Sequence, residues 1–156
     1  MKVKAIPEGF HSLTPSLIVS NSAKAIEFYQ QAFGAKKRRM FTMPDGKTIY
    51  AEIQIGDSIL VLMDEVPEMK AFSPLSVGGG TSAGLVMYVE DVDAVFKKAV
   101  TAGAKVTMPL EDAFWGDRSG SIVDPFGHRW MLSKHMKDMS DEELEKAMMT
   151  MFTKNS

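Results

Sequence analysis

Few side chains in this chain could take part in covalent or acid–base chemistry, because it has no cysteine and only three histidines among 156 residues. The lack of cysteine excludes disulfides, thiolate metal sites and thiol nucleophiles. Glu52 is the best candidate for a general base, since enclosure among apolar side chains would make its carboxylate hold a proton more tightly. Two structural alternatives are open: an ion pair of Glu52 with Arg118 or Arg129, and an ion pair between Arg118 and Asp117.

Composition and charge restrict the class of protein. Hydrophobic residues make up 45% and charged residues 24% of the chain, as in an ordinary globular domain. The net charge of -2 offers no basic surface, so we expect no nucleic-acid partner. The first residues lack the apolar core of a signal peptide, and no segment is long and apolar enough to span a bilayer. These features predict a cytoplasmic protein with no membrane partner.

Capping and stop residues divide the chain into two similar units. Asn21 and Asp91 are candidate helix N-caps, and Gly34 and Gly103 are candidate stops, so the members of each pair lie about 70 residues apart. The hydrophobic pattern predicts the same order twice, a strand, a helix and then three strands. We expect a single domain over residues 1–156, with module one at 12–64, a linker at 65–82, module two at 83–135 and a C-terminal helix at 140–152.

The predicted C-terminal helix has its own start signal and its own apolar stripe. Ser140 and Glu143 form a capping box, and Leu144, Met148 and Met151 recur at helical spacing. Docking of this helix on its own domain and docking against a partner chain are both open at this point.

The most distinctive motif lies in module two, where the sequence reads WGDRSGSIVDPFGHRW from Trp115 to Trp130. Pro125 fixes φ at the second position of a turn and Gly127 tolerates a positive φ, so residues 124–127 are predicted to form a tight turn between two strands. This run resembles the vicinal oxygen chelate superfamily, which contains glyoxalase I, the bleomycin-resistance proteins and the extradiol dioxygenases. Within that superfamily it is most similar to the PhnB-like branch.

The resemblance implies an α+β fold of two βαβββ modules, each curled into an open half-barrel with its helix outside, which together enclose a cavity. In the superfamily a first module commonly pairs with the second module of a partner chain, which implies a homodimer. The glycines at 78–80 leave an exchange of modules between chains open.

Alternation along the strands sorts the side chains into those that pack on the helices and those that face the cavity. Apolar residues such as Leu17 and Ile53 belong to the helix-facing rows. The offset of 70 residues relates Arg118, Gly120 and Ile122 to positions 48, 50 and 52, and so predicts that they face the cavity. The resulting ligand-binding candidates are Thr14, Ser16, Tyr50, Glu52, Tyr88, Trp115, Arg118, Arg129 and Met131.

The resemblance also implies where a metal would bind. Metal-dependent members usually place His and Glu ligands on the first and fourth strands of each module. The matching positions in this chain are Thr14, Val61, Gly84 and Met131. None of them supplies a carboxylate or an imidazole, so we predict no metal and no cofactor. The three histidines, His11, His128 and His135, lie off these positions and are interpreted as turn or surface residues.

Two hypotheses for the function follow, from different classes. The leading one is a metal-independent small-molecule-binding protein, and the alternative is a metal-dependent glyoxalase-type lyase, isomerase or dioxygenase with non-standard ligands. Because a guanidinium group presents a fork of donors that suits carboxylates and phosphates, Arg118 is predicted to seat an anionic ligand. The apolar or aromatic body of that ligand would then lie against Tyr50, Tyr88, Trp115 and Met131.

Overall fold

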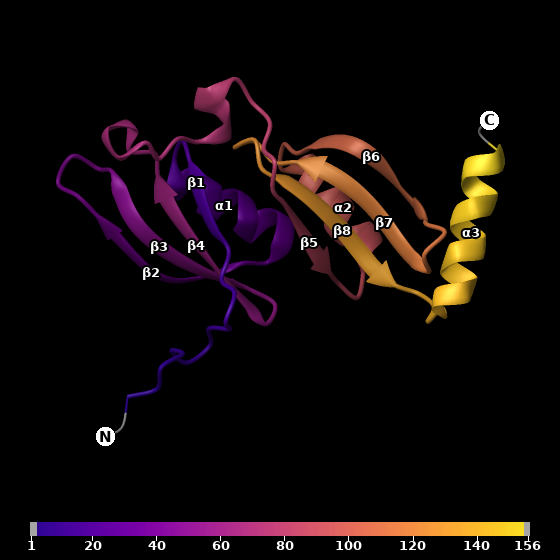
Figure 1. Cartoon of the computed structure of the whole chain (residues 1–156). Helices are drawn as coiled ribbons and strands as arrows, with labels where there is room; N and C mark the ends of the chain where they lie inside the picture. Colours follow the sequence, from indigo (N-terminus) through magenta and orange to yellow (C-terminus); the bar gives the residue numbers. More distant parts are fainter. Residues whose placement is uncertain (1–2, 155–156) are drawn as a thin grey trace.

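The first module is a four-stranded sheet with one helix (Figure 1). The computed structural model describes residues 3–154. Its first module contains β1 (Ser16–Val19), α1 (Ser22–Phe33), β2 (Lys36–Thr42), β3 (Thr48–Ile55) and β4 (Ser58–Asp64). The sheet order is β1-β4-β3-β2, with β1 parallel to β4 and the other neighbours antiparallel.

The second module repeats this plan. It contains β5 (Gly84–Tyr88), α2 (Val92–Thr101), β6 (Lys105–Asp112), β7 (Asp117–Val123) and β8 (Arg129–His135), in the sheet order β5-β8-β7-β6. Ser16 pairs with Val61 in the first sheet, and Val86 pairs with Met131 in the second. Each residue of the second pair lies 70 positions after its equivalent in the first, as predicted for the two parallel strands of each module. The predicted α+β fold of two modules is confirmed.

Each module helix begins at the predicted cap. The side chain of Asn21 accepts a hydrogen bond from the backbone N–H of Lys24 at 2.9 Å, and Asp91 accepts one from Ala94 at 3.0 Å. These bonds satisfy donors that a helix start otherwise leaves free. At the end of α1, Gly34 adopts a left-handed φ of 67°, which a glycine reaches without the steric cost of a side chain.

The helices α1 and α2 touch each other and cover one side of the two sheets, while the other side stays open (Figure 1). The covered side forms the core, where Ala51, Ile53 and Leu62 are fully buried in the first module and Ile122 and Leu132 in the second. The open side of each sheet is therefore accessible to a ligand.

The two modules are joined by aromatic packing and by two polar contacts. The rings of Phe33 and Trp130 lie 4.8 Å apart between centroids. Tyr29 donates a hydrogen bond to Asp124 Oδ2 at 2.6 Å, and His128 Nε2 lies 2.8 Å from the carbonyl oxygen of Ile18. The linker between the modules carries two short 3-10 turns, η1 (Pro67–Met69) and η2 (Pro74–Val77).

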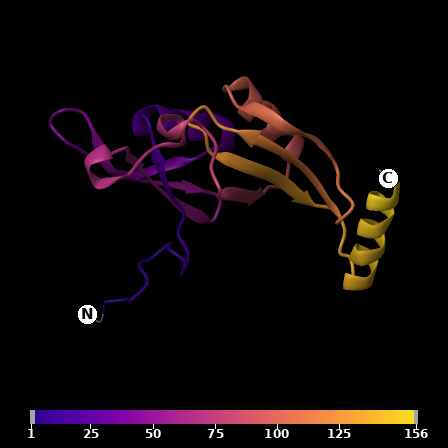
Figure 2. The same ribbon diagram turned by 45° about the horizontal axis from the view of Figure 1, so that its top comes forward.

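The last helix, α3 (Asp141–Lys154), stands beside the far end of the second sheet in both views (Figures 1 and 2). Its capping box is present, because the N–H of Ser140 donates to Glu143 Oε2 at 2.8 Å and the N–H of Glu143 donates to Ser140 Oγ at 3.3 Å. No residue of α3 is buried. None of the helices within residues 3–154 has the length and apolar character needed to cross a membrane.

Candidate functional site

A cavity of about 450 Å³ lies on the open side of the second sheet, between the β6–β7 hairpin and α3. The strand register places Ser121 beside Met131 and Ser119 beside Ser133 on this side. The cavity wall is mostly apolar, with hydroxyl and carboxylate groups at a few points. Its lining residues are Met108, Glu111, Asp112, Ala113, Phe114, Trp115, Ser119, Gly120, Ser121, Met131 and Met151.

The floor of this site is ordered by small polar contacts. The hydroxyl groups of Ser119 and Ser133 lie 2.9 Å apart and are buried. Ser121 is also buried and directs its hydroxyl toward the thioether of Met108 at 3.8 Å. A flexible methionine such as Met108 adapts its shape easily, so this wall can accommodate apolar ligands of different outlines.

Next to the cavity, the buried carboxylate of Asp117 holds three donors. Tyr88 donates its hydroxyl at 2.9 Å, Trp115 donates its indole N–H at 3.2 Å, and His135 Nδ1 lies at 2.8 Å. Burial raises the pKa of Asp117, but the hydrogen bonds from His135, Tyr88 and Trp115 outweigh it and leave the pKa below its usual range. The carboxylate therefore stays ionised and fixes the orientation of Trp115 at the cavity wall.

His135 joins this network to the segment that leads into α3. Its second ring nitrogen, Nε2, lies 2.9 Å from Asp138 Oδ1. The hydrogen bonds to Asp138 and Asp117 raise the pKa of His135 above its usual value. The prediction of His135 as an ordinary surface residue at the strand exit missed these two carboxylates, because only the folded chain brings Asp117 beside it.

On the first sheet, Glu52 is buried, with 4% of its side chain exposed, among basic rather than purely apolar neighbours. Its Oε2 atom lies 3.5 Å from Arg38 Nε and 3.3 Å from Arg39 Nε, and Tyr50 donates a hydrogen bond to Oε1 at 2.9 Å. The expected pairing with Arg118 or Arg129 is wrong: two residues of the adjacent β2 take this role. The two guanidinium groups and the Tyr50 hydroxyl thus already engage the Glu52 carboxylate within its own module.

Arg118 faces the helix side of the second sheet, so the prediction that it faces the cavity is wrong. Its guanidinium group binds Asp93 of α2 at 2.8 Å and Asp112 of β6 at 3.1 Å. The next residue on the same face, Gly120, lies so close to α2 that an added Cβ would come within 2.6 Å of Phe96. The suggested pair between Arg118 and Asp117 is absent as well, because neighbouring residues of a strand point to opposite faces.

The turn that follows β7 explains why the face of Arg118 was predicted wrongly. Eight residues separate the paired residues Glu52 and Val61, whereas nine separate the equivalent pair, Ser121 and Met131. The offset between the modules is therefore 69 in β7, one less than in the parallel strands. A shift of one residue exchanges the two faces of a strand.

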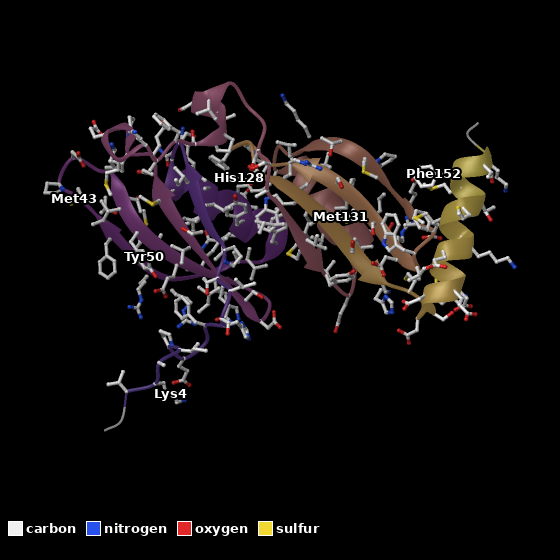
Figure 3. The ribbon with its side chains drawn as sticks, in the orientation of Figure 1. Lys4, Met43, Tyr50, His128, Met131 and Phe152 are labelled. Atoms are coloured by element: carbon white, nitrogen blue, oxygen red, sulfur yellow. The ribbon has the colours of Figure 1, made fainter. Side chains whose placement is uncertain are left out.

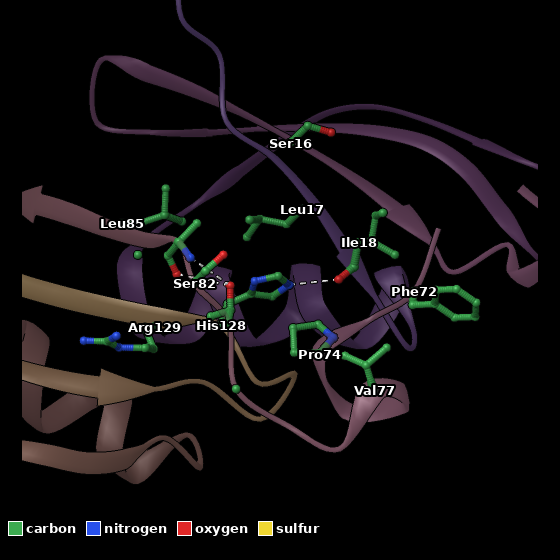
Figure 4. A pocket seen from close by; sticks show the side chains of 14 residues that line it. Ser16, Leu17, Ile18, Phe72, Pro74, Val77, Ser82, Leu85, His128 and Arg129 are labelled. Atoms are coloured by element: carbon green, nitrogen blue, oxygen red, sulfur yellow. Dashed lines mark hydrogen bonds between the residues drawn. The ribbon is translucent and has the colours of Figure 1, made fainter. Parts of the chain in front are cut away.

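Arg129 lies on the open side of β8, at the edge of a second cavity of about 450 Å³ between the modules (Figure 4). Ser16 of β1 lines the same cavity from the first module. His128 is held at its floor by the contact with the carbonyl of Ile18. Within residues 3–154, no carboxylate forms an ion pair with Arg129, so its guanidinium group is available to an anion.

The predicted binding residues thus do not converge in one chain. Trp115 and Met131 line the cavity on the second sheet, Tyr88 reaches its Asp117 network, and Tyr50 lies on the other sheet (Figure 3). Thr14 precedes β1 and directs its hydroxyl toward the backbone of His11 at 3.4 Å. The residues that sequence reasoning missed are those of the true open face of β7, Asp117, Ser119 and Ser121.

The side chains present do not fit a metal centre of the type found in the metal-dependent relatives. The predicted metal positions hold Thr14, Val61, Gly84 and Met131, and none of these side chains supplies a carboxylate or an imidazole for a divalent ion. In the described part of the chain, no three His, Asp or Glu side chains come close enough together to bind a metal.

Comparisons with known proteins place these observations in a family. The model of the Glyoxalase/Bleomycin resistance protein/Dioxygenase superfamily matches residues 9–132. The Mycobacterium bovis protein Mb0911c, which is uncharacterized, is 42% identical over 140 residues, covering 88% of this chain and 91% of that protein.

Two solved structures share the fold at low sequence identity. The PhnB protein from Bacillus cereus superposes with a TM-score of 0.59 at 21% identity, over 80% of this chain and 99% of that one. The fosfomycin resistance protein FosX from Listeria monocytogenes, complexed with Mn(II) and sulfate, gives a TM-score of 0.62 at 18% identity, over 85% and 95% of the two chains.

Proposed function

This chain belongs to the glyoxalase/bleomycin resistance/dioxygenase superfamily, and we propose that within it the protein binds a small molecule without a metal. The observation that carries this proposal is the cavity on the second sheet, whose wall combines apolar side chains with the hydroxyls of Ser119 and Ser121. A mostly apolar cavity with a few placed polar groups is typical of ligand-binding sites. The residues at the four metal positions of the superfamily supply no suitable ligand set.

The chemistry of the cavity favours a ligand with an apolar or aromatic body. Trp115 and Phe114 pack edge to face, with their ring centroids 5.1 Å apart, and Met131 of β8 lines the same cavity. Since Arg118 is engaged by Asp93 and Asp112, we assign the anionic end of such a ligand to Arg129. Arg129 lies at the edge of the neighbouring cavity between the modules, two residues before Met131 on the same face of β8. Arg129 thus replaces Arg118 in the proposed binding mode.

We propose a homodimer as the functional unit, because the open sides expose apolar side chains. Val86 is 60% and Tyr88 is 61% exposed on β5, and Met108 is 46% exposed on β6. Apolar surface of this kind, bordered by polar groups, is typical of interaction sites. Light scattering should give twice the chain mass of 17.2 kDa, and a monomer mass at micromolar concentration would contradict this part of the proposal.

Binding is tested with 8-anilinonaphthalene-1-sulfonate, an aromatic anion whose fluorescence rises in apolar sites. Met131→Trp would fill the cavity with a bulky side chain, so it should reduce probe affinity at least tenfold. Met69→Trp is the matched control, because Met69 is 75% exposed on η1 and lines no part of the cavity. Equal binding by both variants would place the probe elsewhere and contradict the proposed site.

Metal independence is tested separately by elemental analysis of protein purified without chelator. Added Zn²⁺, Ni²⁺, Mn²⁺ or Fe²⁺ should leave the melting temperature unchanged, since an ion that binds only the folded state would raise it. A stoichiometric metal that survives dialysis would favour the metal-dependent alternative instead.

A further inference from the structure

The helix α3 carries acidic groups that its own chain does not neutralise. Residues 141–145 read Asp-Glu-Glu-Leu-Glu, and Glu143 is used by the capping box and by Lys137 at 3.7 Å. No ion pair of Asp141, Glu142 or Glu145 occurs among residues 3–154. Carboxylates in a first turn stabilise a helix through its dipole, and they remain available to a cation on another surface.

Part of the apolar surface of this helix is exposed. It has 14 residues, and none of them is buried. Met148 is 41% and Met149 is 66% exposed, while Met151 lines the cavity on the second sheet. Because a helix of this length is marginal in water by itself, a surface that covers Met148 and Met149 would stabilise it.

A surface of opposite charge lies on β2. Lys36, Lys37, Arg38 and Arg39 form its first half, and the exposed Phe41 follows at 53% exposure. Glu52 pairs with the two arginines, whereas neither lysine has an ion-pair partner in the part of the chain that the structure describes. β2 is an edge strand, and lysines on an edge discourage pairing with another strand while leaving the surface open to a helix.

These two surfaces lie at opposite ends of one chain (Figures 1 and 2). A helix cannot reach the β2 of its own chain across both sheets, so a contact between these two surfaces would join two molecules. An antiparallel arrangement of two chains brings each α3 to the partner's β2 and makes both contacts at once. A two-fold contact of this kind closes on itself and does not grow into a fibre.

We propose that α3 docks on β2 of a second copy of this chain, with residues 141–145 against residues 36–39 and the exposed methionines against the Phe41 end. Since Met151 is part of the cavity wall, the partner's β2 then holds in place the helix that completes the cavity. The inference rests on the proposed homodimer and not on the identity of the ligand. A dimer without this contact would leave the homodimer intact and remove only the interface.

The absence of cysteine allows a clean cross-linking test. The double variant Lys37→Cys and Met149→Cys is treated with a bis-maleimide, and the products are separated on a denaturing gel. The expected product is a covalent dimer with no higher species. Lys98→Cys with Met149→Cys is the matched control, because Lys98 is exposed on α2, away from β2, and this pair should give much less dimer.

Two cross-linking outcomes would overturn the proposal. Equal yields from the two cysteine pairs would show that the reaction reports chance collisions, and a ladder of multimers would show contacts that do not close.

Charge reversal provides an independent measurement in the uncross-linked protein. Lys36→Glu with Lys37→Glu, or Glu142→Lys with Glu145→Lys, should each raise the dimer dissociation constant at least tenfold in sedimentation experiments at low salt. All four changes in one chain should restore dimerisation, because the attraction is rebuilt with opposite signs. Failure of the four-fold variant to recover, with circular dichroism showing that it is folded, would overturn the pairing.

Discussion

The carboxylate oxygen Oδ1 of Asp117 lies 2.8 Å from Nδ1 of His135, and this contact joins the start of β7 to the end of β8. Two backbone hydrogen bonds lie next to it, donated by the N–H groups of Met136 and Lys137 to the carbonyl oxygen of Gly116. Asp138 holds the other side of the imidazole at 2.9 Å. The position of the segment before α3 therefore depends on a group that titrates near neutral pH.

We predict a stability change with pH that depends on His135. Because its pKa is raised in the folded state, the protonated imidazole contributes stability that is fully present below about pH 6.5 and is lost as the pH rises through the folded pKa. Asp117 has the opposite dependence: its pKa is lowered, so its contribution is present above about pH 4 and is lost in acid. Both contributions to stability are therefore fully present between about pH 4 and about pH 6.5.

The measurement is the melting temperature between about pH 5 and pH 9, a range in which histidine is the side chain that ordinarily titrates. His135→Gln should flatten the decline above neutrality, whereas His11→Gln should leave it unchanged, since no ion pair of His11 occurs within residues 3–154. A wild-type curve that stays flat across this range would contradict the raised pKa.

The two arginines of the second module should behave in opposite ways. Arg118→Met removes an exposed ion pair with Asp93 and Asp112, so it should lower the melting temperature by about 1–4 °C and leave probe binding within twofold. Arg129→Met should weaken 8-anilinonaphthalene-1-sulfonate about tenfold, because the anion loses its guanidinium partner, with little change in melting temperature. The reverse pattern would indicate that Arg118, and not Arg129, binds the anion.

The sequence was sufficient for the fold because its signals are local. Asn21 and Asp91 mark helix starts through hydrogen bonds to residues three positions on, and these signals act within one turn of the chain. The faces of β3 and β8 were also predicted correctly, since apolar rows such as Ala51 and Ile53, or Trp130 and Leu132, stand out against polar neighbours.

The candidate site was harder to predict, because β7 is poor in large apolar residues. The offset of 70 residues predicted that Arg118, Gly120 and Ile122 face the cavity. The polar Ser119 and Ser121, which alternate with the apolar Ile122, indicate instead that the serines face the cavity and Ile122 faces the helices. The strand's own alternation would have been the better guide, since offsets change with turn length. The Asp117–His135 contact spans 18 residues and depends on the β7–β8 register, which no local pattern specifies.

The hydrogen bond of Tyr29 should stabilise the packing of the two modules against each other. Its hydroxyl donates to Asp124 Oδ2 at 2.6 Å, and Tyr29 is fully buried, so Tyr29→Phe should lower the free energy of unfolding by about 1–3 kcal/mol. Tyr88→Phe is the matched control, because Tyr88 also donates to a carboxylate but is 61% exposed, and it should cost less. Urea unfolding followed by circular dichroism provides both values, and equal losses would contradict the importance of the buried contact.

Gly120 should not tolerate a side chain, because β7 passes close to α2 at this point. A Cβ at this position would lie 2.6 Å from Phe96 Cε2 and 3.0 Å from the Leu110 backbone, both well inside van der Waals contact. Gly120→Ala should therefore lower the free energy of unfolding by about 1–3 kcal/mol, as overpacking of a core does. Gly84→Ala is the control, since its Cβ would meet nothing closer than 3.8 Å and should change stability little. Equal urea midpoints for the two variants would show that α2 can move away from β7, and would weaken the assignment of Arg118 and Gly120 to the helix side.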